Sequence, residues 1–154
     1  MERGHLIRLA AVVAALLCVP AAAAGTHVSW LLQGTTEPNG TQRPHAYFAS
    51  MRSDLGPWVR RLTPMHQARV RRVDFSRTVI VAGFLDGSAC ALDVRLRDWT
   101  FIRGRLVVNV TFRKPPIGVA TCVRTSTSYL VIGFSRAQLG RLPTHVEMRI
   151  VARS

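Results

Sequence analysis

The alternation of apolar and polar side chains is clearest between residues 73 and 134, where it has the two-residue period of β-strands. Residues 78–85 are apolar on both alternating faces, which predicts a central strand covered from both sides. Residues 92–97 alternate apolar with charged side chains and predict a strand with one buried and one exposed face. Residues 106–112 repeat this alternation and predict a further strand of the same kind.

Turn-forming dipeptides separate these strands. They are Asp86-Gly87, Arg103-Gly104 and Pro115-Pro116. Asp86-Gly87 and Arg103-Gly104 predict tight turns. Gly87 and Ser88, at the first of these turns, are candidate residues for contact with a partner. Pro115 and Pro116 predict the end of a strand, because proline cannot donate to a β ladder, and they are candidates for a binding loop.

Three more strand segments and one helical turn are expected toward the C-terminus. The segments are residues 119–124, 129–134 and 146–150. Ser135 and Gln138 have the spacing of a capping box, so a single helical turn is expected to begin there and to end at Gly140.

Weaker patterns precede the strand region. Short strands are expected at residues 28–32 and 47–51, with a loop at 34–44 that is rich in Gly, Pro, Asn and Thr. Residues 55–62 place apolar side chains at helical spacing and predict one short amphipathic helix. Pro64 is expected to end that helix.

These elements predict a mainly β protein, because helix-length segments do not alternate with strands as a parallel βαβ protein requires. An antiparallel β-sandwich or a partly open barrel with one or two short helices is expected. The predicted organisation is a signal peptide at 1–24, then strands, a loop and a short helix at 25–67 that pack on the core, then a β domain at 68–154.

The first 24 residues have the pattern of a secretory signal peptide. Arg3 and Arg8 give a positive start, residues 9–19 are apolar, and three alanines end at Ala24, where cleavage is expected. The apolar stretch is shorter than the roughly 20 residues that span a bilayer, which disfavours an uncleaved anchor. The protein is therefore expected to be secreted or to lie in the cell envelope, with no transmembrane anchor.

The chain is strongly basic. Its formal charge is +13, and loss of the predicted signal peptide leaves about +12. Such a charge favours acidic partners such as anionic polymers, polysaccharide, or an acidic protein. The alternative is that an arginine-rich composition with Lys114 as the sole lysine reflects codon usage, with the charge solvating strand faces. Secretion disfavours nucleic acid as a binding partner.

Two cysteines, Cys90 and Cys122, follow the predicted signal peptide. In an oxidising compartment they are expected to form one structural disulfide, which would constrain the unfolded chain by roughly 3–4 kcal/mol. A catalytic or redox role is disfavoured because neither has a Cys-x-x-Cys partner or an adjacent histidine.

Arginines alternate in three pairs, and each pair could project from one face of a strand or hairpin. The pairs are Arg69 and Arg71, Arg95 and Arg97, and Arg103 and Arg105. If the faces coincide, they form a basic stripe, with Arg95, Arg97, Arg103 and Arg105 as candidate partner-binding residues. Trp99 shares the parity of Arg95 and Arg97, so it either lies beside the cations as a binding platform or packs under the sheet edge.

The sequence contains no recognisable catalytic or metal-binding motif. The histidines at 27, 45, 66 and 145 lack the spacing that aims two ligands at one metal. Asp93 and Asp98 could act as an acid and base only if the fold joined them; salt bridges to the neighbouring arginines are the alternative. We therefore expect no enzyme activity, no metal and no cofactor.

The strand region resembles the C-terminal domain of protease complex subunit PrcB proteins. The resemblance rests on residues 73–76, 78–81 and 104–108, and on Pro115-Pro116-Ile117-Gly118. The family usually has a Thr-Gly-Gly-Tyr-like turn where this chain has Gly87-Ser88-Ala89-Cys90-Ala91. A fainter similarity is to chagasin-like inhibitors of cysteine proteases.

The resemblance implies a secreted, non-catalytic binding module that associates with and stabilises a protein partner such as a protease. The altered turn puts the family's specific partner contact in question. Two alternatives stay open: a basic domain that binds acidic envelope polymers or polysaccharide, and an inhibitor of a secreted protease.

Overall fold

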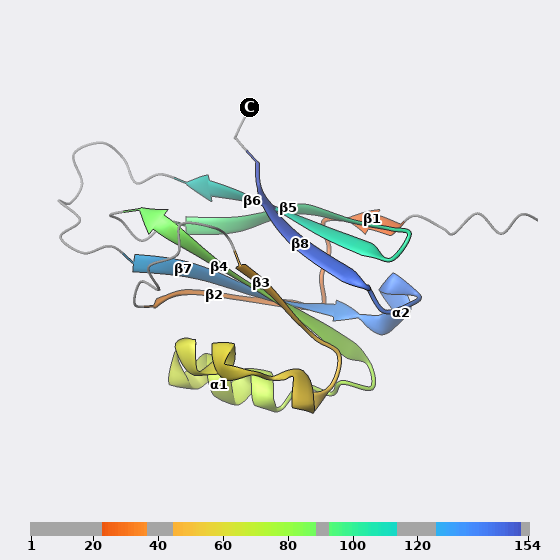
Figure 1. Cartoon of the computed structure of the whole chain (residues 1–154), viewed down its shortest axis with the longest axis horizontal. Helices are drawn as coiled ribbons and strands as arrows, with labels where there is room; N and C mark the ends of the chain where they lie inside the picture. The colour runs from red at the N-terminus through yellow and green to blue at the C-terminus, as the bar shows by residue number, and fades with distance from the viewer. Residues whose placement is uncertain (1–22, 37–44, 89–92, 114–125, 152–154) are drawn as a thin grey trace, which may run out of the picture.

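The computed structural model describes residues 23–36, 45–88, 93–113 and 126–151. Two four-stranded sheets pack face to face (Figure 1). Sheet A contains, in spatial order, β1 (Ala23–Gly25), β5 (Asp93–Ile102), β6 (Arg105–Arg113) and β8 (His145–Ile150). Sheet B contains β2 (Trp30–Thr36), β7 (Ser126–Ser135), β4 (Thr78–Ser88) and β3 (His45–Ala49). The expected mainly β class is confirmed, and it takes the form of a sandwich.

One strand pair departs from the antiparallel pattern. β8 runs parallel to β6, whereas all other neighbours in the two sheets are antiparallel. The short helix α2 (Arg136–Leu139) follows β7 of sheet B and leads the chain across to β8 at the edge of sheet A (Figure 1). A strand that arrives by such a crossover can align in parallel with its neighbour.

Helix α2 lies where the sequence predicts a helical turn, and it ends at Gly140 with φ +71°. The expected capping hydrogen bond from the Ser135 side chain does not form. The amide of Gln138 instead donates to the carbonyl oxygen of His27 at 3.0 Å. Gln138 therefore ties α2 to the chain before β2.

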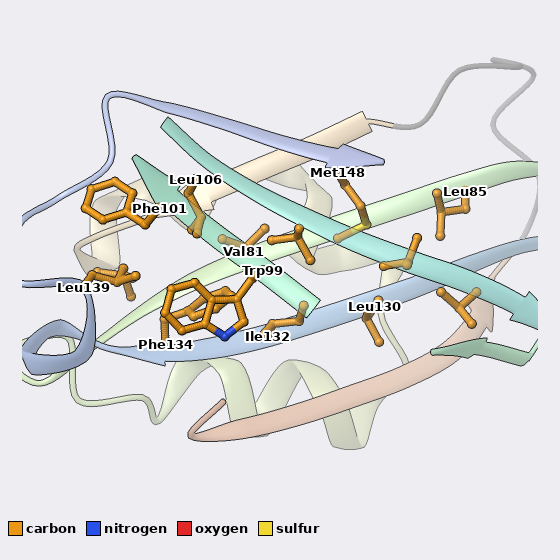
Figure 2. Close-up of a cluster of buried hydrophobic side chains, with 14 residues drawn as sticks. Val81, Leu85, Trp99, Phe101, Leu106, Leu130, Ile132, Phe134, Leu139 and Met148 are labelled. Carbon is orange, nitrogen blue, oxygen red and sulfur yellow. The ribbon is translucent and has the colours of Figure 1, made fainter. Parts of the chain in front are cut away.

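The larger apolar core lies between the two sheets (Figure 2). Its largest members are the rings of Trp99 and Phe134, which meet edge to face with their centroids 5.5 Å apart. The remaining buried members come from both sheets and from α2: Val79, Val81, Leu85, Val94, Phe101, Leu106, Val108, Val110, Leu130, Ile132, Leu139 and Met148. Burial of this apolar surface is the main force that holds sheet A on sheet B.

A layer of short helices covers the outer face of sheet B (Figure 1). This helical layer consists of η1 (Arg52–Asp54), η2 (Pro57–Arg61) and α1 (Pro64–Arg71). Trp58 is its main anchor, 3% exposed and stacked on Tyr47 of β3 at 6.1 Å between centroids. Because β4 and β7 are covered on both sides, the expected burial of residues 78–85 on both faces is confirmed.

The sequence assigned two boundaries in this region incorrectly. Pro64 does not end a helix but begins α1, because proline is well suited to the first helical position, where no N–H partner is needed. Residues 57–61 form a separate 3-10 turn. The turn expected at Asp86-Gly87 does not form at these two residues, since β4 continues through Gly87 to Ser88 with a register shift after Leu85.

Sheet B joins the two parts that the sequence separated at residue 67. β2 and β3 precede that position, and they flank β7 and β4, which follow it. β2 also extends to Thr36, into the segment expected to be a loop. Residues 25–67 therefore supply two of the four strands of the sheet rather than only packing on it.

Several sequence predictions lie outside the described residues. They concern the disulfide between Cys90 and Cys122, the loop at Pro115 and Pro116, and the strand at 119–124. Cleavage after Ala24 would fall within β1, which pairs with β5 from Trp99 to Phe101. Among the described helices, none is long and apolar enough to cross a membrane.

Candidate binding surfaces

The β5–β6 hairpin carries the four arginines that the sequence predicts as binding residues. Arg95, Arg97 and Arg105 are exposed on the strands, and Arg103 is exposed in the turn between them. Arg103 and Gly104 have φ values of 50° and 83°, as the two central residues of a tight type I′ hairpin require. The structure therefore brings these four arginines onto one hairpin.

A β-bulge separates Trp99 from this group. The register between β5 and β6 shifts between Leu96 and Asp98, so Arg97 is an extra residue on β5. One extra residue reverses the side-chain alternation beyond it. Trp99 therefore faces the core and is 1% exposed, although its sequence parity matches that of Arg95.

The indole of Trp99 is fully engaged inside the protein. Its Nε1–H donates to the carbonyl oxygen of His27 at 3.0 Å, and its ring packs against Phe134 (Figure 2). Trp99 presents no ring face to a ligand on the surface. The expected aromatic platform beside the arginines is not formed.

Carboxylates neutralise part of the positive charge on this face of sheet A. Glu147 on β8 accepts hydrogen bonds from Arg149, at 2.6 Å from Nε, and from Arg105 of β6. These bonds lower the pKa of Glu147 from 4.5 to about 2, and the bond from Arg149 makes the largest contribution. Asp98 lies 3.6 Å from Nε of Arg97. Arg97 and Arg105 of the predicted stripe therefore already have anionic partners in the folded chain.

The Glu147 pair predicts a pH-dependent contribution to stability. Because the folded-state pKa lies below the unfolded value, the contribution is fully present above pH 4.5 and is lost as the pH falls toward about 2. We expect the difference in urea midpoint between the wild type and Glu147→Gln to be constant from pH 7 to 5 and to shrink below pH 4.5. A difference that stays constant down to pH 2 would contradict this assignment.

A second set of arginines lies in and just after the helical layer. Seven occur between residues 52 and 77: Arg52, Arg60, Arg61, Arg69, Arg71, Arg72 and Arg77. All except the partly buried Arg61 are exposed. The guanidinium carbon of Arg61 lies 4.2 Å from the centroid of the Phe84 ring, so this arginine packs over the aromatic core.

The two carboxylates in this segment are occupied by local hydrogen bonds. Asp54 accepts from the backbone N–H groups of Ser50 and Met51 at 2.8 and 3.0 Å, and the bond from Ser50 is the main reason that its pKa is lowered. Asp74 accepts from the hydroxyl of Ser76 at 2.6 Å, which lowers its pKa in the same way. Within the described part of the chain, neither carboxylate forms an ion pair with an arginine.

Two cavities open on the helical layer. The first has a volume of about 550 Å³ and is lined by Arg52, Leu55, Gly56, Pro57, Val59, Arg60 and Arg71. The second, of about 520 Å³, lies between α1 and β2 and is lined by Trp30, Met65, Ala68, Arg69, Arg72 and Val73. The guanidinium of Arg69 lies 5.9 Å from the centroid of the Trp30 ring.

The alternation of Arg69 and Arg71 predicted that both side chains project from one face of a strand. Both residues lie on helix α1 instead. Successive helical residues are about 100° apart, so two residues at i and i+2 point in nearly opposite directions. Arg69 accordingly lines one cavity and Arg71 the other. Thr63-Pro64 was the available signal, because proline after a residue with an N-cap side chain is a helix start.

His66 has a structural role in this layer. Its Nδ1 lies 2.7 Å from the hydroxyl of the buried Tyr129, which also accepts a long hydrogen bond from the N–H of Thr63 at 3.4 Å. These contacts hold the start of α1 against sheet B. The described residues contain no group of three or more His, Cys, Asp or Glu side chains placed to hold a metal ion.

No protein-family model, curated protein or solved structure matches this chain. The fold and the two cavities define a β-sandwich with an arginine-rich helical layer on one sheet. The resemblance of the strand region to the PrcB domain stays a prediction.

Proposed function

We propose that this protein is a secreted, non-catalytic binding module that holds an acidic polymer against the arginines of residues 52–77. One observation supports this choice of surface most directly. The exposed arginines of this segment form no ion pair within the described part of the chain, whereas Arg97, Arg105 and Arg149 on sheet A each have a carboxylate partner. Secretion and the disulfide between Cys90 and Cys122 are part of the proposal.

The exposed arginines of residues 52–77 give this surface a positive charge that no described ion pair neutralises. Several guanidiniums on one surface repel one another, and a bound polyanion relieves that repulsion while it releases counterions. Arginine also suits this role because its planar group donates two parallel hydrogen bonds to a carboxylate or phosphate. An acidic polymer of the cell envelope supplies such groups at regular intervals.

Retention on immobilised polyanions tests the proposal. Polyphosphate and polygalacturonate columns, eluted with a salt gradient, are expected to retain the wild-type chain. A variant in which Arg52, Arg60, Arg69 and Arg71 are replaced by glutamine is expected to bind about fiftyfold more weakly, because four exposed ion pairs at roughly 0.2–1 kcal/mol each sum to about 2.4 kcal/mol at the middle of that range.

A matched control variant removes four positive charges from the β5–β6 hairpin of sheet A instead of from the helical layer on sheet B. Glutamine at Arg95, Arg97, Arg103 and Arg105 lowers the net charge equally, but it removes side chains from a face that carries its own carboxylates. This variant is expected to elute close to the wild type. Equal weakening of both variants would show that net charge alone governs retention and would contradict the assignment to residues 52–77.

The second cavity favours a second function, association with a protein partner. Trp30, Met65 and Arg69 gather there, and Met65 is 73% exposed. Trp, Met and Arg are the residue types enriched at the centres of protein interfaces. The PrcB resemblance implies a partner of protease type, and the chagasin similarity implies protease inhibition. Binding to a purified protease that persists in high salt and is lost in Met65→Glu would favour this function.

A further inference from the structure

Three arginines from separate helices line the first cavity of the helical layer. Arg52 comes from η1, Arg60 from η2 and Arg71 from the last turn of α1. Arg52 and Arg60 lie on consecutive turns of one short segment, and the contact between α1 and η2 brings Arg71 beside them. The cavity of about 550 Å³ is therefore a product of the tertiary structure.

The cavity is electropositive, because three arginines and no carboxylate are among the described residues that line it. Asp54 carries the carboxylate nearest in sequence to Arg52. Its Oδ2 accepts three hydrogen bonds, two from Ser50 and one from Met51. Among the described ion pairs, none involves Arg52, Arg60 or Arg71. The three cations are therefore available to an external anion.

The rest of the wall is apolar. Leu55 and Pro57 line it together with Val59, which is 3% exposed. These apolar side chains lie beside the three arginines in a cavity that is open to solvent. The apolar wall offers a contact surface for the carbon atoms of a ligand. The cavity thus suits an anionic group that is attached to a small organic frame.

The number of donors indicates the type of anion. One guanidinium fork satisfies both oxygens of a carboxylate, whereas a phosphate monoester presents three terminal oxygens that can accept from three arginines, and a diester unit presents two. The volume of about 550 Å³ lies in the range of small-molecule sites, about 300–1,000 Å³, so it exceeds what a lone oxyanion needs. A phosphate ester matches both the cations and the apolar wall.

We infer that the cavity bounded by Arg52, Arg60 and Arg71 is a binding subsite for a phosphate ester group. This inference rests on the proposed binding of acidic polymers and names the anion that the surface recognises. The same chemistry could come from a free phosphorylated small molecule or from a phosphate unit of a polymer. The two sources are distinguished by the ligand used.

Calorimetric titration of the whole mature chain tests the inference. Two ligands are used, glycerol phosphate and a short poly(glycerol phosphate). Arg71→Gln and Arg52→Gln are each expected to weaken binding by about tenfold or more, as loss of a charge-assisted hydrogen bond does. Arg141→Gln removes the same charge from an exposed site beyond α2 and is expected to change the affinity by less than about threefold. Arg71→Lys keeps the charge but not the planar fork and should restore only part of the binding.

The outcomes separate this inference from the proposed function. Binding of either ligand that depends on Arg52 and Arg71 supports the subsite, and the ligand that binds tells which source it serves. Unchanged or absent binding of both ligands, in a chain still retained by polygalacturonate, overturns the subsite and leaves the proposed function. A chain that no polyanion column retains overturns both. Circular dichroism of each variant confirms that it is folded.

Discussion

Replacing Trp99 by alanine is expected to lower the free energy of unfolding by about 3–5 kcal/mol, the usual cost of removing a large buried aromatic side chain. Trp99 is 1% exposed, packs edge to face on Phe134 and donates its indole N–H to the carbonyl of His27. The substitution opens a cavity between the sheets and removes one of the two described donors to that carbonyl, leaving the amide of Gln138. Urea unfolding followed by circular dichroism measures the loss.

Ile102 on the same strand supplies the control. It is 49% exposed, so Ile102→Ala removes an apolar side chain that contributes little to the core. We expect a loss below about 1 kcal/mol, as for ordinary surface substitutions. Similar small losses for both variants would show that Trp99 lies at the surface and that β5 has no bulge at Arg97.

Replacing Arg136 by methionine is expected to lower the free energy of unfolding by about 2–4 kcal/mol, because two charge-assisted hydrogen bonds are lost at once. Its Nε donates to the carbonyl oxygen of Phe75 at 2.7 Å, and one of its Nη groups donates to that of Ser50 at 2.6 Å. Arg136 thereby ties α2 to the segments before η1 and before β4. Methionine keeps the aliphatic contacts and removes only the donors.

Two further variants make the Arg136 prediction specific. Arg136→Lys can reach only one carbonyl well and is expected to show an intermediate loss. Arg141→Met removes a nearby exposed arginine whose contact with the Phe101 ring, at 5.7 Å, contributes about 0.5–1 kcal/mol. Equal losses in Arg136→Met and Arg141→Met would contradict the role of Arg136 as a tie between segments.

The arginines show how far sequence patterns reach in this chain. The turn at Arg103-Gly104 was predictable because the type I′ turn requires specific residues at adjacent positions. The bulge at Arg97 was not predicted, although the apolar positions of β5 change phase there, from Val94 and Leu96 to Trp99 and Phe101. That one residue decides whether Trp99 is a surface platform or a core side chain.

The candidate site was harder to predict than the fold. Arg52, Arg60 and Arg71 follow no common period, and each belongs to a different short helix. Local sequence signals specify such turns, but they do not specify how the turns pack on a sheet. The first cavity of the helical layer therefore had no signature in the sequence beyond a high density of arginine.

The sequence by itself determined the β class, the buried central strand at residues 78–85 and the strongly basic charge, because alternation and composition are local properties. The tertiary structure alone decided which arginines are compensated and which line a cavity. Charge compensation depends on distances between side chains that are far apart in the chain, such as Arg105 and Glu147. Such distances exist only after the sheets and the helical layer have packed.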